Sequence, residues 1–573
     1  MGNYRQEYEK WLASGVLTPE ETAELEAIRD DDREIESRFY ANLVFGTAGL
    51  RGTMGMGTNR MNVYVIRHAT QAFAEVVLAE GPEAAKRGVA ICFDCRNHSE
   101  EFAQTAACVM AANGIPSYLF SELRPTPELS FAVREYGCIA GINVTASHNP
   151  KEYNGYKVYW EDGAQLPPVH ASAIAAKMDV LDVFKDVKCL SWEDARATGL
   201  ITMLGEDTDN RFLANVFAQR VDVEAVREAG KTIKMVFTPF HGTGWKLIPY
   251  VLRQIGIEHV YCVPEQMVID GDFPTVASPN PENAPSFAMA VELAKQVGAD
   301  FILGSDPDAD RVGVMIRSRE GDFVPVSGNQ TGVLLLDYLI GALRRAGKMP
   351  EKPVALKTIV TTEMARAVAN QAGLDCYDTF TGFKFLAEKK NKLEATGEGK
   401  VIFAYEESYG YMVGDYVRDK DAVTAALLLT SMAAWYYGQN KTLWDALDEI
   451  RARVGWYGEK TLNLMMPGLD GLDKMKNLMA RLRSDPPADL AGTPVMAVRD
   501  YLAGTRTSGG KAEPMELKDS NVLGFELADG TLVQVRPSGT EPKIKIYVLA
   551  KGENGPDVDA KVAAYAAWAE ALA

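Results

Sequence analysis

The order of apolar and polar positions predicts strands that alternate with helices along most of the chain. In the first block, the apolar runs VAICFDC, SYLFSE and CIAGINVTAS flank two amphipathic segments, SEEFAQTAACVMAANG and PELSFAVREYG. Short apolar runs predict strands, and segments with an apolar face every three to four residues predict helices. Ser99 is the candidate N-cap of the first helix. This alternation indicates βαβ units and a parallel sheet.

The same order recurs in two further blocks. The second block contains TIKMVFTPF, WKLIPYVLRQIG, HVYCVPE, a helical face over 287–297 and ADFILGSD. The third contains VALKTIV, EMARAVANQAG, DCYDTF, FKFLAEKKNKLEATG and VIFAYEES. Each block ends in a strand that leads into a polar loop, TASHNP, SDPDADR or YEESYG. Since ligands bind beyond the carboxyl ends of strands in open α/β sheets, we expect the three loops to converge on one cleft.

The two ends of the chain depart from this pattern. Residues 1–40 are charged and predict a helical extension, and residues beyond about 456 predict an α+β domain with a hairpin at Asp529-Gly530 and a final Ala-rich helix. We therefore predict an α/β fold. It has three similar α/β domains with mixed, mostly parallel sheets and a C-terminal α+β domain, arranged around one central cleft. The predicted domains are 1–205, 206–324, 325–456 and 457–573.

Composition narrows the range of partners and compartments. The 573 residues have a formal net charge of −18, which argues against nucleic acid and against a membrane surface as partners. The polar N-terminus predicts no signal peptide, and the apolar run at 422–438 is too short to span a membrane, so it predicts a buried helix. Seven scattered cysteines indicate reduced thiols and a cytoplasmic protein.

Cys92 and Cys95 form a CxxC that is compatible with redox or zinc chemistry. Both also lie in or beside a predicted buried strand, and the sequence contains no second CxxC. The structural interpretation is therefore favoured.

Three carboxylates on alternate residues follow the last strand of the second block. Asp306, Asp308 and Asp310 in a tight loop can turn inward together and offer hard oxygen ligands to a divalent cation. An EF-hand is excluded, because Arg311 stands where the sixth position needs Gly and Arg317 where the twelfth needs Glu. A solvated turn is the alternative, but repulsion among three carboxylates favours a metal site suited to Mg²⁺.

The segment RPSGT in the C-terminal region is a candidate phosphate site. Its arginine can grip a phosphate with two hydrogen bonds, its hydroxyls can donate, and its glycine lets backbone N–H groups approach an anion. An ordinary solvated hairpin loop is the alternative. The candidate residues are Arg536, Ser538, Gly539 and Thr540.

Ser147 ends the apolar run CIAGIN and is followed by His148 and a Tyr-Asn-Gly segment that predicts a turn. A hydrolase would need an elbow such as GxSxG, which is absent, and the side chains of Ser147 and His148 should diverge in extended backbone. A serine near a metal site and a phosphate site suits phosphoryl transfer instead. In the third block, Glu406 and Ser408 should share one face of extended backbone and could bind vicinal sugar hydroxyls.

Together and in this order, these four loops resemble those of the α-D-phosphohexomutase superfamily. TASHNP with the following YNGYK, and DPDADR, are highly specific, and GTAGLRG at 46–52 is similar to an early element of the family. The resemblance spans nearly the whole chain and implies four domains, three alike and a distinct fourth that closes the cleft.

The resemblance also implies the reacting groups. Ser147 would carry the phosphoryl group, Lys157 would be a general acid/base, and Arg51 and His148 would line the phosphoryl site. Mg²⁺ would be held by Ser147, Asp306, Asp308 and Asp310. The substrate-binding residues would be Arg311, Thr381, Gly382, Lys384, Glu406, Ser408, Lys420, Arg536, Ser538, Gly539 and Thr540.

Two segments that differ from the mannomutase-like pattern bear on which sugar phosphate the protein acts on. Mannomutase-like members often read E-M-S-G-H where this chain reads EESYGY, and Arg418 and Lys420 of RDKD resemble the glucomutase arrangement, as does TGFKF at 381–385. The chain looks closest to bacterial α-phosphoglucomutases and phosphopentomutases. The expected activity interconverts α-D-glucose 1-phosphate and glucose 6-phosphate through a phosphoserine and glucose 1,6-bisphosphate. Mannose or pentose phosphates are the alternatives, and a sugar-phosphate phosphatase or a non-catalytic binder is a less favoured one.

Overall fold

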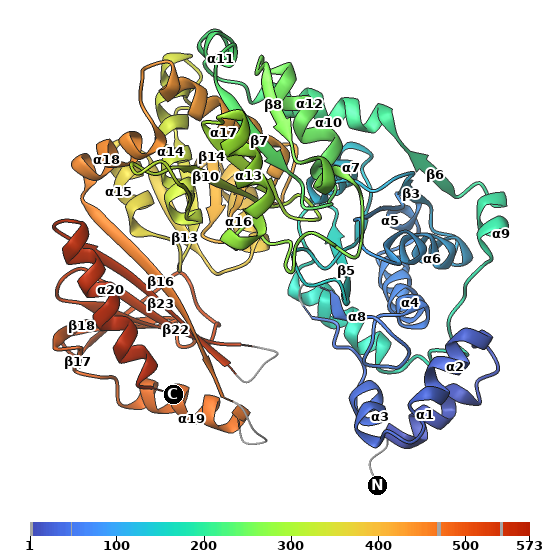
Figure 1. Ribbon diagram of the computed structural model, residues 1–573. Helices are drawn as coiled ribbons and strands as arrows, with labels where there is room; N and C mark the ends of the chain where they lie inside the picture. The colour runs from blue at the N-terminus through green and yellow to red at the C-terminus, as the bar shows by residue number, and fades with distance from the viewer. Residues whose placement is uncertain (1–3, 47–48, 467–470, 539–542, 573) are drawn as a thin grey trace. The chain divides into compact units, whose positions relative to one another are not determined.

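The computed structural model describes residues 4–46, 49–466, 471–538 and 543–572 (Figure 1). The chain divides into two compact units. Unit 1 consists of Met1–Ser327 and Tyr409–Gln439, and unit 2 consists of Gly328–Ser408 and Asn440–Ala573.

Three short helices form the predicted N-terminal extension. They are α1 (Tyr4–Leu12), α2 (Pro19–Ala27) and α3 (Asp32–Phe39). Thr18 begins α2 with a capping box, since its side chain accepts from the Glu21 N–H and its own N–H donates to the Glu21 carboxylate. The apolar side chains of the three helices are buried together with α4 (Val63–Ala79), which continues the chain into the first sheet.

The first sheet of unit 1 has the strand order β1-β5-β4-β2-β3-β6. Strands β2, β3 and β4 are parallel as predicted, and β6 extends this parallel part. Strands β5 and β1 add an antiparallel edge. The strands are β1 (Leu50–Thr53), β2 (Val89–Phe93), β3 (Ser117–Phe120), β4 (Ala140–Val144), β5 (Tyr153–Trp160) and β6 (Ile201–Leu204). The helices are α5 (Pro82–Lys86), α6 (Ser99–Ala112), α7 (Thr126–Glu135), α8 (Pro168–Met178) and α9 (Trp192–Ala197).

Two local predictions in this sheet are wrong. The Tyr-Asn-Gly segment is not a turn but the start of β5, where Tyr153 pairs with Thr53 and Gly155 with Arg51. Ser99 does not cap α6: His98 precedes the helix in a left-handed conformation, and the Ser99 hydroxyl donates to Asp94 at 2.8 Å. At the Tyr-Asn-Gly segment, pairing with the distant strand β1 outweighs the local turn preference. At Ser99, the bond to nearby Asp94 engages the hydroxyl that would otherwise cap the helix.

The second sheet of unit 1 repeats the arrangement, with the strand order β11-β10-β9-β7-β8. Strand β7 is parallel to β8 and β9, while β10 is antiparallel to β9 and β11. The strands are β7 (Lys234–Thr238), β8 (His259–Cys262), β9 (Phe301–Ser305), β10 (Val312–Arg317) and β11 (Phe323–Val326). The helices are α10 (Glu206–Ala218), α11 (Val223–Gly230), α12 (Gly244–Gln254), α13 (Ala288–Val297) and the 3₁₀ turns η1 (Pro264–Met267) and η2 (Ala284–Phe287).

Unit 1 also contains a segment from the third block. Strand β15 (Gly410–Met412) leads to α17 (Ala422–Tyr437), which packs on α12 and α11. Residues Ala422–Ala434 of α17 are all buried, which confirms that the apolar run beginning at 422 forms a buried helix. Among the described residues, none of the helices is long and apolar enough to cross a membrane.

Unit 2 holds the third repeat, in which β12 (Pro353–Thr358) is parallel to β13 (Asp375–Thr379) and to β14 (Lys400–Glu406). In all three blocks the first strand therefore lies between the second and the third, as the repeated pattern of the sequence implies. The helices of this part are α14 (Gly328–Arg345), α15 (Glu363–Gln371), α16 (Phe383–Thr396) and α18 (Leu443–Val454).

The C-terminal part of unit 2 is an antiparallel sheet with the order β16-β23-β22-β21-β18-β19-β20. The predicted hairpin is present, with Gly530 at a φ of +82° in its turn. The strands are β16 (Trp456–Met465), β17 (Asp489–Leu490), β18 (Thr493–Asp500), β19 (Thr505–Ser508), β20 (Lys511–Pro514), β21 (Leu523–Leu527), β22 (Leu532–Pro537) and β23 (Lys543–Gly552). Helices α19 (Gly471–Ser484) and α20 (Gly555–Glu570) complete it, so the predicted mixed α/β class and α+β ending are confirmed.

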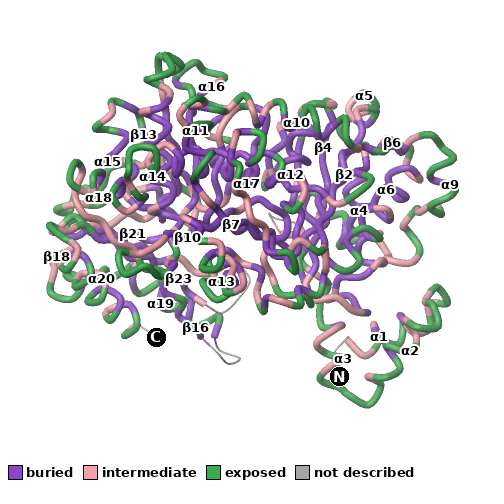
Figure 2. The backbone as a smooth tube through the Cα atoms, turned by 45° about the horizontal axis from the view of Figure 1, so that its top comes forward, coloured by how far each residue is buried: buried purple, intermediate pink, exposed green. Residues whose placement is uncertain are grey.

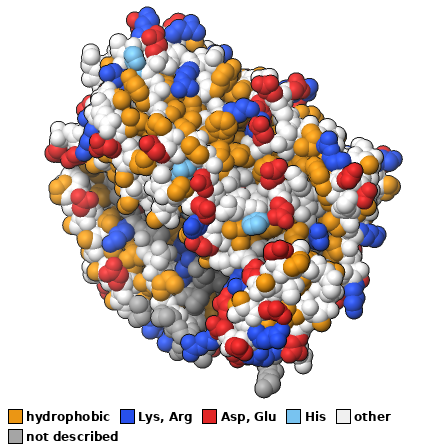
Figure 3. All heavy atoms as spheres, turned by 45° about the vertical axis from the view of Figure 1, so that its right-hand side comes forward, with side chains coloured by type: hydrophobic (Ala, Val, Ile, Leu, Met, Phe, Trp, Pro, Cys, Tyr) orange, Lys and Arg blue, Asp and Glu red, His pale blue; other side chains and the backbone are white. Residues whose placement is uncertain are grey.

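The central strands of the sheets in unit 1 are almost entirely buried. Strands β2, β4 and β7 are drawn in the buried colour over nearly their whole length, while α9 is mostly exposed (Figure 2). On the face shown in Figure 3, acidic and basic side chains are interspersed among hydrophobic ones.

Candidate active site

Ser147 lies just beyond the carboxyl end of β4, in a backbone conformation that exposes its hydroxyl to neighbouring polar groups. Its φ is +54°, which is a left-handed conformation that costs a non-glycine residue about 1 kcal/mol or more. The hydroxyl lies 3.1 Å from Nδ1 of His148 and donates to Oδ2 of Asp306 at 3.1 Å. The expectation that Ser147 and His148 diverge is therefore wrong, because it assumed extended backbone at Ser147.

Arg96 holds the loop that carries Ser147. Its guanidinium donates to the carbonyl oxygens of Ser147, Asn149, Pro150 and Tyr153, at 2.6, 2.5, 2.9 and 3.0 Å respectively. The side chain is fully buried, and its Nε lies 3.3 Å from Asp94. Four charge-assisted bonds to one loop fix a backbone that would otherwise relax from its strained conformation.

The three aspartates after β9 converge as the sequence predicts. One carboxylate oxygen from each of Asp306, Asp308 and Asp310 lies within 4.8 Å of the others, and all three side chains are buried. Burial and the charges of the other two carboxylates raise the pKa of Asp306 well above its usual value. Like charges held this close out of water favour a bound cation.

The triad suits a hard divalent cation. In the described part of the chain, Oδ1 of Asp308 and Oδ1 of Asp310 are buried and have no hydrogen-bond partner. Unpaired buried carboxylate oxygens are costly unless something else satisfies them, and oxygen donors are what Mg²⁺ and Ca²⁺ take. The donor set therefore fits a metal ion.

Cations from two other elements reach the same carboxylates. Lys157 of β5 donates to Oδ2 of Asp308 at 2.8 Å, and Lys420 lies 3.2 Å from Oδ2 of Asp310. The hydroxyl of Thr126, at the start of α7, donates to Oδ2 of Asp308 at 2.9 Å, and its N–H donates to the backbone carbonyl of Asp308 at 2.8 Å. Although burial raises the pKa of Asp308, the Lys157 ammonium and these hydrogen bonds lower it below its usual value.

Asp419 neutralises and orients Lys420. The Lys420 amine donates to it at 3.0 Å, and its other oxygen accepts from the Tyr159 hydroxyl at 2.8 Å and from Gln165 at 3.1 Å. All of these side chains except Gln165 are buried. The network therefore fixes the lysine next to the aspartate triad.

Three further predicted residues surround Ser147. Arg51, on β1, donates to the side-chain oxygen of Asn149 at 3.0 Å. Arg311 forms an ion pair with Glu282 at 3.1 Å and lies 3.7 Å from Asp310. Burial and then the charges of Arg311 and Arg51 hold the pKa of His148 well below its usual value. The imidazole is therefore neutral near pH 7 and available to the Ser147 hydroxyl as a hydrogen-bond partner.

The remaining predicted residues belong to unit 2. Glu406, at the end of β14, is buried and accepts from the Gly382 N–H at 2.7 Å. Ser408 lies in the turn after β14, so the extended backbone expected through it ends at Glu406. Thr381 precedes Gly382, and Lys384 extends over the Phe385 ring at 4.9 Å.

The RPSGT segment is described only in part. Arg536 is half-buried in β22 opposite Lys545 of β23, and the Ser538 N–H donates to the Lys543 carbonyl at 2.9 Å. Gly539 and Thr540 lie outside the described residues. The described side chains thus stand at the end of the antiparallel pair of β22 and β23.

Sequence reasoning missed four residues that shape this site: Arg96, Thr126, Tyr159 and Asp419. Each acts through a partner more than fifty residues away, so no local motif marked it. Only Asp419 could have been inferred from the sequence, because it lies in the RDKD segment between Arg418 and Lys420. For the CxxC, burial raises the pKa of both Cys92 and Cys95 well above the usual thiol value, which supports the structural interpretation.

Comparison with known families defines the class of this protein. Models for the Phosphoglucomutase/phosphomannomutase alpha/beta/alpha domains I, II and III match residues 42–182, 210–320 and 327–454, and the model for the C-terminal domain matches 486–555. The chain belongs to the phosphoglucomutase/phosphomannomutase family and is a mutase enzyme.

Individual relatives within this family are phosphoglucomutases. A phosphoglucomutase of Staphylococcus epidermidis (strain ATCC 35984) is 36% identical over 519 residues, which cover 90% of this chain and 92% of the relative. A phosphoglucomutase of Staphylococcus aureus (strain MSSA476) is 35% identical over 542 residues, or 93% and 94% of the two chains.

Solved structures agree on the fold. Parafusin, a phosphoglucomutase from Paramecium, aligns with a TM-score of 0.68 at 18% identity over 93% of this chain and 94% of its own. A phosphoglucomutase/phosphomannomutase family protein from Burkholderia thailandensis aligns with a TM-score of 0.63 at 19% identity over 92% and 97%.

Proposed function

We propose that the protein interconverts α-D-glucose 1-phosphate and glucose 6-phosphate, with Ser147 as the phosphoryl carrier. The observation that carries this proposal is the contact between the Ser147 hydroxyl and Asp306 of the buried carboxylate triad, 3.1 Å apart. Relatives named phosphoglucomutase at about 35% identity over nine-tenths of the chain support glucose as the sugar.

In the first half-reaction, the free hydroxyl of the sugar phosphate attacks the phosphorus of phosphorylated Ser147. The bond from phosphorus to the serine oxygen breaks, the bond to the sugar oxygen forms, and glucose 1,6-bisphosphate results. The sugar hydroxyl loses a proton, and Ser147 Oγ gains one as its hydroxyl is restored. We assign both transfers to Lys157: its ammonium gives a proton to the Ser147 oxygen, and the resulting amine takes the proton of the sugar hydroxyl. In the second half-reaction the other phosphate of the bisphosphate returns to Ser147.

The protein contributes mostly position and charge, because phosphoryl transfer asks for little covalent chemistry beyond the serine. Arg96 keeps the serine loop in its strained conformation, and Asp419 holds Lys420 next to the triad. Neutral His148 stabilises the Ser147 hydroxyl by a hydrogen bond, while Arg51 and Arg311 supply positive charge near the transferred group.

We propose that the metal is Mg²⁺. Asp306, Asp308, Asp310 and an oxygen on Ser147 would hold it, and the unpaired carboxylate oxygens of the triad support this set. When bound, the ion neutralises negative charge on the phosphoryl oxygens.

We assign sugar recognition to residues of unit 2. Glu406 and Ser408 bind sugar hydroxyls, and Thr381, Gly382 and Lys384 sense which way the sugar is turned. The bond from Gly382 to Glu406 supports this grouping, since it joins the two loops. The phosphate that is not being transferred is bound by Arg536, Ser538, Gly539 and Thr540, with Lys420 as a further contact to the substrate.

Two broader expectations complete the proposal. Each of the four expected domains encloses one of the matched family ranges, which supports the expected boundaries. These domains are 1–205, 206–324, 325–456 and 457–573. A cytoplasmic location is supported by the seven cysteines, all within the described residues, which are free thiols.

The direct test is a steady-state assay with glucose, mannose and ribose 1-phosphates, each with Mg²⁺ and a trace of glucose 1,6-bisphosphate. The expected result is the highest kcat/KM with glucose 1-phosphate and glucose 6-phosphate as the main product. A higher kcat/KM with mannose or ribose 1-phosphate would overturn the sugar assignment, and inorganic phosphate as the main product would overturn the mutase assignment.

A further inference from the structure

The N-terminal extension is firmly packed although none of its residues is used in the proposed chemistry. Trp11 is fully buried and meets the rings of Phe39, Tyr64 and Phe184 edge to face, with ring centroids 5.7, 5.7 and 5.2 Å away. Aromatic contacts of this geometry add to the gain from burial. The first matched family range begins at residue 42, so helices α1 to α3 lie before it.

Helices α2 and α3 hold one particular loop, residues 54–61, through an ion pair between exposed Glu24 and largely buried Arg38. The carboxylate of Glu24 accepts from the guanidinium of Arg38 and, at 3.0 Å, from the backbone N–H of Met56. Arg38 also donates to the Met56 carbonyl at 3.3 Å. Both backbone groups of Met56 are therefore satisfied by the extension.

Further bonds run along the same loop. The Asn59 N–H donates to the Arg38 carbonyl at 2.9 Å, and Asn59 Nδ2 donates to the Ser37 carbonyl at 3.1 Å. At Gly57, with a φ of +134°, an added Cβ would lie 2.8 Å from the Arg38 carbonyl oxygen. Glycine thus permits an approach of backbone to backbone that a side chain would prevent.

The loop is the direct continuation of β1, the edge strand that carries Arg51. Strand β1 is paired on one side, to β5, and runs straight into Met54. In the described part of the chain, Arg51 makes a single side-chain hydrogen bond, to Asn149. The place of its guanidinium therefore depends on how firmly β1 and the loop after it are held.

We propose that the Glu24–Arg38 pair of the extension is a positioning element that holds loop 54–61, and through it β1, so that Arg51 faces the phosphoryl site. This proposal rests on the proposed function for the role of Arg51. Arg38 and Glu24 touch neither Ser147 nor the aspartate triad; they act through Met56 and the strand.

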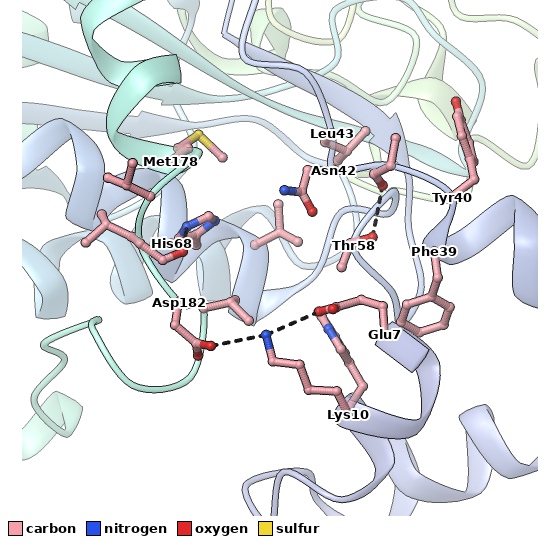
Figure 4. Close-up of a pocket in the computed structure, with 16 residues that line it drawn as sticks. Glu7, Lys10, Phe39, Tyr40, Asn42, Leu43, Thr58, His68, Met178 and Asp182 are labelled. Carbon is pink, nitrogen blue, oxygen red and sulfur yellow. Dashed lines mark hydrogen bonds and ion pairs between the residues drawn. The ribbon is translucent and has the colours of Figure 1, made fainter. Parts of the chain in front are cut away.

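Lys10 of α1 provides a matched control. It lies at an open cavity of about 430 Å³ that α4, the segment after α8 and Thr58 of loop 54–61 also line (Figure 4). Lys10 lies between Asp182 and Glu7, at 3.1 and 3.5 Å (Figure 4), and among the described residues it forms no ion pair with loop 54–61. A Lys10 variant removes ion pairs of the extension without touching the proposed route to Arg51.

The test compares Arg38→Ala, Arg38→Lys, Lys10→Met, Arg51→Ala and the double variant R38A/R51A. We expect Arg38→Ala to lower kcat between about tenfold and a hundredfold, with KM for glucose 1-phosphate changed less than about twofold, because a reacting group is misplaced. Arg38→Lys should recover part of the loss. Lys10→Met should match the wild type. In the Arg51→Ala background, Arg38→Ala should have no further effect.

Two outcomes would overturn the positioning role: wild-type kcat in Arg38→Ala, or an equal fold-loss from Arg38→Ala with and without Arg51. Hydrogen exchange over residues 50–61 separates this failure from that of the proposed function. Faster exchange there in Arg38→Ala, but not in Lys10→Met, supports the mechanical link even if the wild type lacks mutase activity, whereas unchanged exchange refutes it.

Discussion

The four hydrogen bonds from Arg96 to the loop that carries Ser147, which we call the Arg96 clamp, allow a quantitative prediction. Arg96→Lys keeps a positive charge beside Asp94 but replaces a planar fork by one amine, which cannot reach all four carbonyls of the loop. Losing two of the four bonds, at about 1.5 kcal/mol each for bonds that involve a charged group, costs about 3 kcal/mol. At 1.4 kcal/mol per factor of ten, local opening of the loop should become roughly a hundredfold more frequent.

Hydrogen exchange read by mass spectrometry measures this directly. The Asn149 and Tyr153 amides donate within the loop, to the carbonyls of Ala146 and Pro150, so they should be protected in the wild type and exchange roughly a hundredfold faster in Arg96→Lys. We expect kcat to fall by a similar factor, because Ser147 no longer keeps its strained conformation.

Arg87→Lys is the matched control. Arg87 also donates to backbone carbonyls, those of Gly137 and Cys138, and pairs with Glu161, but it lies at the opposite end of β4. Its variant should leave kcat and exchange over 145–155 unchanged. Wild-type exchange and wild-type kcat in Arg96→Lys would refute the clamp.

Three further predictions concern the metal, the phosphate and stability. Asp308→Asn removes a charge from the triad, so the Mg²⁺ concentration for half-maximal activity should rise at least about tenfold; an unchanged metal titration would contradict the ligand assignment. Arg536→Ala should raise KM for glucose 1-phosphate roughly thirtyfold, or about 2 kcal/mol, with a smaller effect on kcat, and an unchanged KM would count against the phosphate site. Although burial raises the pKa of Glu363, Lys357 and Arg366 lower it from 4.5 to about 2. Because this folded-state pKa is depressed, the Glu363 carboxylate stabilises the fold above pH 4.5 and the stabilisation is lost as the pH falls towards 2. The difference in thermal unfolding temperature between the wild type and Glu363→Gln should therefore shrink over that range, and a constant difference would refute the pairing.

The regular elements of the fold were predictable because they follow from local patterns. Strands β2, β4, β7 and β9 are mostly apolar, as strands buried on both faces require. The triad was also predictable, since Asp306, Asp308 and Asp310 alternate within one tight loop and need no distant partner to come together.

Most of the errors and omissions have a common physical cause, which is pairing over long distances in the sequence. The Tyr-Asn-Gly segment has strong turn residues, yet β1 pairs with it and makes it the start of a strand. The contact between Ser147 and His148 depends on a left-handed residue that Arg96 stabilises from another segment of the chain. Single-sequence patterns carry no information on such partners.

The central claim is that Ser147 carries the phosphoryl group, and peptide mass spectrometry after incubation with glucose 1,6-bisphosphate tests it most directly. The account predicts a phosphate on the peptide that contains Ser147, which disappears when glucose 6-phosphate is added in excess, and neither phosphate nor mutase activity in Ser147→Ala. A phosphate on another residue, or a Ser147→Ala variant that still interconverts the two glucose phosphates, would contradict it.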